Sequence, residues 1–242
     1  MSGLVAYGNF LFRYRNGLFA LVLFALLFGL PPHPFGGDLA SDRWLDLIGL
    51  LVALAGQGLR AAVIGLAYIK RGGLNKKVHA DDLVTDGLFR HCRNPLYVGN
   101  LLILAGLFII HNNPWVYLLG GAFFVSAYIA IVAAEEHFLA GRFGQAYADF
   151  CRQTPRWWID PRGLRATLAG MRFNWKRVLA KDYASAFTWI VTALAVMAWE
   201  AVQTVGWEAA RPRLEETGTL ALTGLLLVLV VRWLKKRRLL RA

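Results

Sequence analysis

Apolar runs long enough to cross a membrane recur along the whole chain, and this repetition limits the possible folds more than any other feature of the sequence. A helix needs about 20 residues to cross the roughly 30 Å hydrocarbon layer. Backbone polar groups find no water in lipid, so such runs fold as helices. We expect six spans, at residues 17–30, 45–69, 96–110, 115–134, 183–205 and 220–233. The predicted fold class is all-α, a polytopic transmembrane helical bundle.

The positive charges predict how this bundle is oriented. With the N-terminus inside, most of the 27 Lys and Arg residues fall on one side of the membrane, while Arg43, Arg211 and Arg213 fall on the other. This asymmetry follows the positive-inside rule, so we expect both termini to be cytoplasmic. The net charge of +12 is then explained by anionic membrane lipids as partners, and no nucleic acid is expected. We expect a multi-pass protein of a bacterial inner membrane.

Short connections join the spans, so the chain reads as one helical unit in three parts. Residues 1–44 hold the N-terminal span and a loop, and residues 45–161 form a membrane core. Residues 162–242 hold a basic interfacial helix and two more spans. In the core, "HNNP" at 111–114 predicts a tight turn that makes an antiparallel hairpin of the third and fourth spans. The cytoplasmic segments on either side of this hairpin should lie beside each other.

Those two segments carry the chemistry. In "FRHCRNPLYVGN", residues 89–100, Asn94 and Pro95 mark a helix start whose free N–H groups and dipole attract anions, and the neighbouring arginines strengthen the attraction. Glu135 and Glu136 close the returning helix and could bind an ammonium group or ribose hydroxyls. Tyr97 could add a cation–π contact to a sulfonium. The two segments together fit a zwitterionic ligand.

The paired segments "LVTDGLFRHCRNPLYVGN" and "EEHFLAGRFGQAYADFCRQTPRW" also carry a family resemblance. The chain, over residues 45–161, resembles the integral-membrane methyltransferases that include isoprenylcysteine carboxyl methyltransferase and phosphatidylethanolamine N-methyltransferase. The resemblance implies S-adenosylmethionine at the cytoplasmic helix ends, under a helical cap, with a lipid-like acceptor entering from the bilayer. The cofactor-binding residues it implies are Arg93, Asn94, Pro95, Tyr97, Gly99, Glu135 and Glu136, with Arg90, His137 and Tyr147 as further candidates.

Three residues are candidates for catalysis. Arg60 lies well inside the second span, where a charge is costly and faces a cavity or a partner such as Glu135, Glu136 or a lipid phosphate. His91 beside the first motif could act as a base, and Glu136 belongs to the paired acids. No two histidines have metal-ligand spacing, so no metal is expected.

We therefore predict S-adenosylmethionine-dependent methyl transfer to the carboxylate or amine of a lipid or lipid-linked acceptor at the cytoplasmic leaflet. Two alternatives stay open. A membrane sterol or isoprenoid reductase of similar architecture would bind NADPH, although the adjacent glutamates would repel its phosphates. A membrane scaffold without enzymatic activity would need none of the motif residues.

Overall fold

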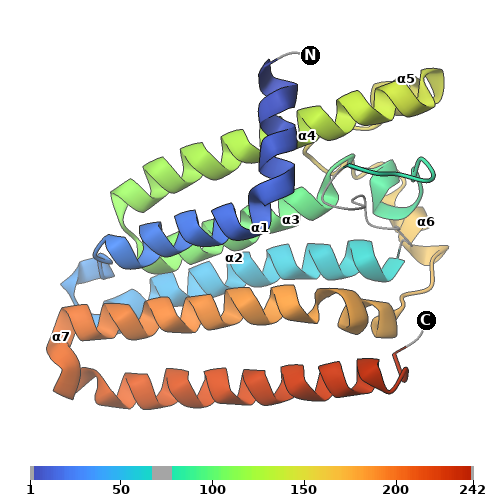
Figure 1. The fold of residues 1–242 in the computed structure, drawn as a ribbon. Helices are drawn as coiled ribbons and strands as arrows, with labels where there is room; N and C mark the ends of the chain where they lie inside the picture. Colours follow the sequence, from blue (N-terminus) through green and yellow to red (C-terminus); the bar gives the residue numbers. More distant parts are fainter. Residues whose placement is uncertain (1–2, 67–77, 241–242) are drawn as a thin grey trace.

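The computed structural model describes residues 3–66 and 78–240, and within these ranges the chain is helical and has no strand (Figure 1). The all-α prediction is confirmed for this part of the chain. The helices are α1 (Gly3–Gly29), α2 (Leu39–Leu66), α3 (Pro95–His111), α4 (Gly121–Phe143), α5 (Gln145–Gln153), α6 (Leu164–Ala169) and α7 (Trp175–Lys236). Short helical turns lie at Phe35–Gly37, Gly87–Arg90 and Val116–Gly120.

Four of the described helices are long and apolar enough to cross a membrane: α1, α2, Val116–Phe143 and α7. The chain is thus an integral membrane protein. Helix α3 is apolar but has only 17 residues. The first span begins far earlier than expected, at Gly3, because its polar residues do not break the helix. Residues 67–69, the expected end of the second span, lie outside the described residues.

The two spans expected after residue 183 form the single long helix α7, which is interrupted once. Gly206 leaves the helical conformation, with φ 77° and ψ 168°, and Pro212 follows within the next two turns. Glycine accepts this backbone conformation without the steric cost that a side chain adds. Figure 1 shows α7 reversing in this region, so that its second limb returns beside the first. The end of the second limb contacts the start of the first, where Lys235 Nζ donates a hydrogen bond to the Ala180 carbonyl at 3.0 Å.

The turn at "HNNP" is tight, as predicted, but it does not pack α3 against α4. Asn112 ends α3 in the left-handed conformation, and the side chain of Asn113 caps the next turn by accepting from Trp115 N at 2.8 Å. Asn113 also donates to Pro31 O at 2.7 Å, which ties the turn to the end of α1. Beyond the turn α3 packs mainly along α2, and α4 along α1. The expected hairpin is therefore splayed, and its helices leave space between them.

Helices α2 and α3 approach closely because glycines face each other at two levels. A Cβ atom on Gly56 would lie 2.6 Å from the Gly99 carbonyl oxygen, and one on Gly49 would lie 2.6 Å from that of Gly106. Small residues at membrane helix crossings allow such backbone contact, which increases van der Waals packing. This crossing holds α3, and with it the first motif, against α2.

Replacing Gly106 by Leu should prevent this crossing. The added side chain would clash with the Gly49 carbonyl and with Ala53, both on α2. The backbone of α2 could move away only at a cost in packing energy. Overpacking of this kind costs about 1–3 kcal/mol or more. We expect a clear fall in the melting temperature of the detergent-purified protein. Gly58→Ala is the control, because a Cβ at Gly58 has open space. Equal melting temperatures for the two variants would contradict the role given to the crossing.

Candidate functional site

A cavity of about 660 Å³ lies where the splayed helices leave space. Helices α1, α3, α4 and α7 form its walls, and Arg60 of α2, α5 and the segment before α3 contribute to it. Its charged lining includes Arg15, Arg60, Asp82, Arg93, Glu135, Glu136 and Lys181. Its apolar lining includes Phe19, Leu23, Ile103, Leu104, Leu107, Phe124 and Trp189. The cavity therefore suits a ligand with a charged part and an apolar part.

An ion pair joins the two predicted motifs at this cavity. Arg93 Nη1 donates to Glu136 Oε1 at 3.0 Å and contacts Cys151 Sγ at 2.8 Å. Arg156 donates to both carboxylate oxygens of Glu136. The start of α3, the end of α4 and the segment after α5 thus meet at Glu136. Arg93 Nε is buried and has no hydrogen-bond partner among the described residues, so one donor of this guanidinium is unsatisfied.

A second polar chain runs beside the first and links α1 to α4. Arg15 Nη1 donates to the Tyr97 hydroxyl at 3.2 Å, and that hydroxyl donates to Glu135 Oε1 at 2.7 Å. The Tyr128 ring lies 5.1 Å from the Tyr97 ring, centroid to centroid. Tyr97 and Glu135 are therefore held together on the cavity wall, as the paired motifs led us to expect. Arg15 was not predicted, because it belongs to a helix far from both motifs in the sequence.

The start of α3 has the predicted geometry. Pro95 is the first helical residue, and Asn94 is the N-cap residue, whose side chain makes no capping bond. Instead, Asn94 Nδ2 donates to the Arg156 carbonyl at 3.1 Å and ties the helix start to the second segment. Asn94 lines the cavity; Pro95 and Gly99 do not. Gly99 makes room for Arg60, since a Cβ there would lie 2.7 Å from Arg60 Cγ.

Arg60 is buried at the cavity wall, but its partner is none of those considered from the sequence. It pairs with Asp182 of α7 and also donates to Asn100 Oδ1. Gln57 Nε2 donates to Asp182 Oδ2 at 2.8 Å and accepts a bond from Trp189 Nε1 at 3.0 Å. Asp182 is thus a site residue that sequence reasoning missed. The available signal was its charge at the edge of an apolar span, where ionisable groups seek partners.

The other candidates divide between the cavity and its surroundings. Tyr147 of α5 lines the cavity, and burial together with the Glu136 carboxylate raises the pKa of its phenol well above the usual value, so it stays protonated. His137 and Arg90 are exposed and do not line the cavity.

His91 is buried outside the cavity lining. Its Nδ1 lies 2.8 Å from the Asp160 carbonyl and its Nε2 lies 2.9 Å from Thr167 Oγ1. Both ring nitrogens are therefore engaged in holding the segment that follows α5. His91 therefore lies beside the first motif, but its side chain does not line the cavity.

The fold and the cavity define a class, that of helical membrane proteins with an internal cavity lined by both charged and apolar side chains. Comparison gives the family, since residues 47–146 match the phospholipid methyltransferase family. This match confirms the resemblance to integral-membrane methyltransferases that was predicted from the two motifs. The matched residues include Arg60, Arg93, Tyr97, Glu135 and Glu136 but not α7.

The chain is also similar to individual proteins of two kinds, metal-resistance proteins and methyltransferases. The cobalt-zinc-cadmium resistance protein CzcN of Cupriavidus metallidurans is 32% identical over 150 residues, which cover 62% of this chain and 66% of the relative. The nickel-cobalt-cadmium resistance protein NccN of Alcaligenes xylosoxydans xylosoxydans is 28% identical over 61% of this chain and 65% of its own length. Protein-S-isoprenylcysteine O-methyltransferase of Tribolium castaneum is 36% identical over 124 residues, which cover 49% of this chain and 43% of the relative.

The chain thus spans just under two thirds of the two resistance proteins and less than half of the isoprenylcysteine enzyme. No solved structure is significantly similar to it.

Proposed function

We propose that the protein transfers a methyl group from S-adenosylmethionine to a lipid or lipid-linked acceptor at the cytoplasmic membrane leaflet. The observation that carries this proposal is the cavity itself. Residues of the family-matched segment surround one end with an arginine, two glutamates and a tyrosine, and apolar side chains of four helices line the rest. A charged cofactor and an apolar acceptor can therefore share one space.

The residues present fit the cofactor. Arg93 Nε has no partner among the described residues, and an arginine binds carboxylates well. Glu135 and Glu136 offer acceptors for an ammonium group or ribose hydroxyls, and Tyr97 offers a ring face to a sulfonium. When bound, S-adenosylmethionine supplies an electrophilic methyl group on that sulfonium. Asn94 and Tyr147 also line the cavity at this end and would complete the binding site.

The chain's own contribution to the reaction is orientation and exclusion of water. The apolar walls from Phe19, Leu107 and Trp189 would hold the acceptor's hydrocarbon part, so that its nucleophile meets the charged end. No covalent bond between acceptor and enzyme is needed. Arg60, fixed by Asp182, presents a positive charge from the wall. His91 acts as a positioning residue, since both of its ring nitrogens are occupied.

The relatives support the acceptor class and the membrane. The enzymes named isoprenylcysteine O-methyltransferase act, by that name, on an isoprenyl-bearing cysteine, which favours a lipid-linked acceptor here. The positive-inside charge pattern supports a cytoplasmic active site. The resistance proteins CzcN and NccN match more of the chain than the isoprenylcysteine enzymes do. CzcN comes from a bacterium, which favours a bacterial inner membrane.

Binding of the product analogue tests the proposal first. Calorimetric titration of the detergent-purified protein with S-adenosylhomocysteine should give saturable binding with a Kd of about micromolar size, whereas NADPH should not bind. A lipid extract and a labelled methyl donor would then identify the acceptor. Binding of NADPH instead would favour the reductase. If protein that shows a cooperative melting transition binds neither S-adenosylhomocysteine nor NADPH, the scaffold without enzymatic activity is the alternative that remains.

A further inference from the structure

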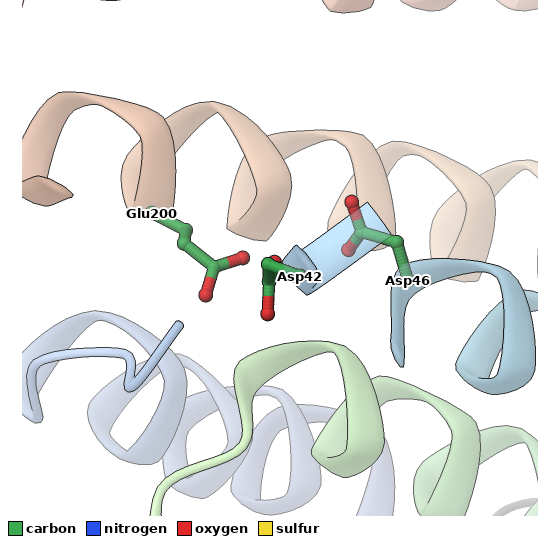
Figure 2. A group of neighbouring side chains, drawn as sticks. All are labelled: Asp42, Asp46 and Glu200. Carbon is green, nitrogen blue, oxygen red and sulfur yellow. The ribbon is translucent and has the colours of Figure 1, made fainter. Parts of the chain in front are cut away.

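Three buried carboxylates meet far from the cavity, between α2 and the first limb of α7 (Figure 2). Asp42 and Asp46 are four residues apart on α2 and share one face of it. Glu200 comes from α7, six residues before the interruption at Gly206. Each residue offers an oxygen, and these oxygens lie within 4.8 Å of one another. Figure 2 shows the Glu200 carboxyl group directed toward Asp42.

An independent observation indicates that this cluster has a ligand. Asp46 Oδ1 and Glu200 Oε1 are buried and have no hydrogen-bond partner among the described residues. The residues are 6% and 1% exposed, so water does not reach these atoms freely. A buried carboxylate oxygen without a partner is costly, and such groups are normally paired or bound to a metal. Both unpartnered atoms belong to the residues that converge.

The charges of the cluster are incompletely balanced. Arg213 donates to Asp46 Oδ2 at 2.6 Å, and the backbone N–H of Phe35 donates to Asp42 Oδ1 at 2.9 Å. With all three carboxyl groups ionised, one guanidinium leaves an excess of two negative charges. Arg43 is exposed to solvent and contributes little to the buried balance. A divalent cation would supply the missing charge.

We propose that Asp42, Asp46 and Glu200 bind a divalent cation of the oxygen-preferring class, such as Ca²⁺ or Mn²⁺. The ligands are all carboxylate oxygens, which suit this class better than the nitrogen and sulfur ligands typical of zinc. Two oxygens on opposite sides of Ca²⁺, each at about 2.4 Å, are about 4.8 Å apart, so the observed separations admit such an ion. The lack of paired histidines predicted no metal. Asp42 and Asp46 share a helix face, but Glu200 is too distant in sequence for a spacing pattern to connect it with them.

The site has a route of entry and a structural role. A second cavity of about 220 Å³ lies between α2 and both limbs of α7, where it is lined by Arg213 and Glu216 and touches the cluster at Asp46. The bound ion would tie the start of α2 to the end of the first limb, near the reversal. Asp46 precedes Arg60 by 14 residues, or about 21 Å along α2, so the ion takes no part in the methyltransferase site.

Manganese binding by the full chain tests this proposal. We expect the detergent-purified protein to remove about one Mn²⁺ per chain from solution, measured from the electron paramagnetic resonance signal of the free ion, and Ca²⁺ to compete. Either ion should raise the melting temperature, because it binds only the folded chain. Glu200→Gln and Asp42→Asn should each weaken Mn²⁺ binding at least about tenfold, since each removes a charged ligand.

The matched control is Glu215→Gln, which removes an exposed carboxylate of the second limb. It should bind Mn²⁺ as the unmodified protein does, and Glu200→Gln should still bind S-adenosylhomocysteine. The proposal is overturned if folded, unmodified protein shows no saturable binding of Mn²⁺ or Ca²⁺. It is also overturned if Glu200→Gln and Asp42→Asn bind Mn²⁺ as tightly as the control. A shared proton, rather than a metal ion, would then explain the cluster.

Discussion

Glu136→Gln is expected to weaken S-adenosylhomocysteine binding by about 10- to 100-fold and to lower methyl transfer at least as much. Arg93 and Arg156 both donate to Glu136, so the neutral amide loses charge-assisted bonds to two elements at once. Hydrogen bonds to charged groups contribute about 1.5–3 kcal/mol each, which corresponds to roughly this range. Calorimetric titration measures the binding, and a labelled methyl donor measures transfer.

The matched control for this prediction is Asp149→Asn on the neighbouring helix α5. Asp149 is exposed and pairs with Arg152 on the same helix, so its loss removes a carboxylate near the site without touching the cavity. The Asp149→Asn variant should bind S-adenosylhomocysteine as the unmodified protein does, since exposed ion pairs contribute little to stability. The role given to Glu136 is wrong if both variants, with similar melting temperatures, bind S-adenosylhomocysteine equally.

The sequence could predict that the two motif segments lie beside each other, because the turn between α3 and α4 has a local signal. The Asn-Pro turn between α3 and α4 reverses the chain, so the segments flanking the two helices lie at the same end of the bundle even though the helices splay apart. Helix starts and ends also have local signals, and Pro95 begins α3 as expected. These predictions needed no knowledge of which helix packs against which.

The parts that were missed depend on packing between distant segments. The splaying of α3 from α4 follows from glycine contacts of α3 with α2, and it is this splaying that leaves space for the cavity. Gly206 could not be recognised as the reversal point of α7, since an isolated glycine is common in apolar helices. The carboxylate cluster joins residues more than 150 positions apart. No periodic pattern in the sequence reports such contacts.

The ion pair of Arg60 with Asp182 is another contact between distant segments that the sequence did not predict. Breaking it should have the largest effect on stability among the variants considered. Asp182→Ala should lower the free energy of unfolding by about 3–5 kcal/mol, because it leaves the Arg60 guanidinium buried with no counter-charge. Gln57 would lose its acceptor as well. Thermal unfolding in detergent measures the loss, and Asp149→Ala, which breaks an exposed pair, should cost less than about 1 kcal/mol.

The double variant Arg60→Met, Asp182→Leu separates stability from function at this pair. Replacing a buried ion pair by apolar residues of similar volume is often neutral or stabilising, so the double variant should recover most of the stability that Asp182→Ala loses. If Arg60 serves the reaction, methyl transfer stays low in this stable protein while S-adenosylhomocysteine binding persists. If transfer recovers together with stability, Arg60 only holds α7 against α2. Because Asp182 lies outside the family-matched residues, the first result would place part of the active site on α7, beyond the segment that matches the family.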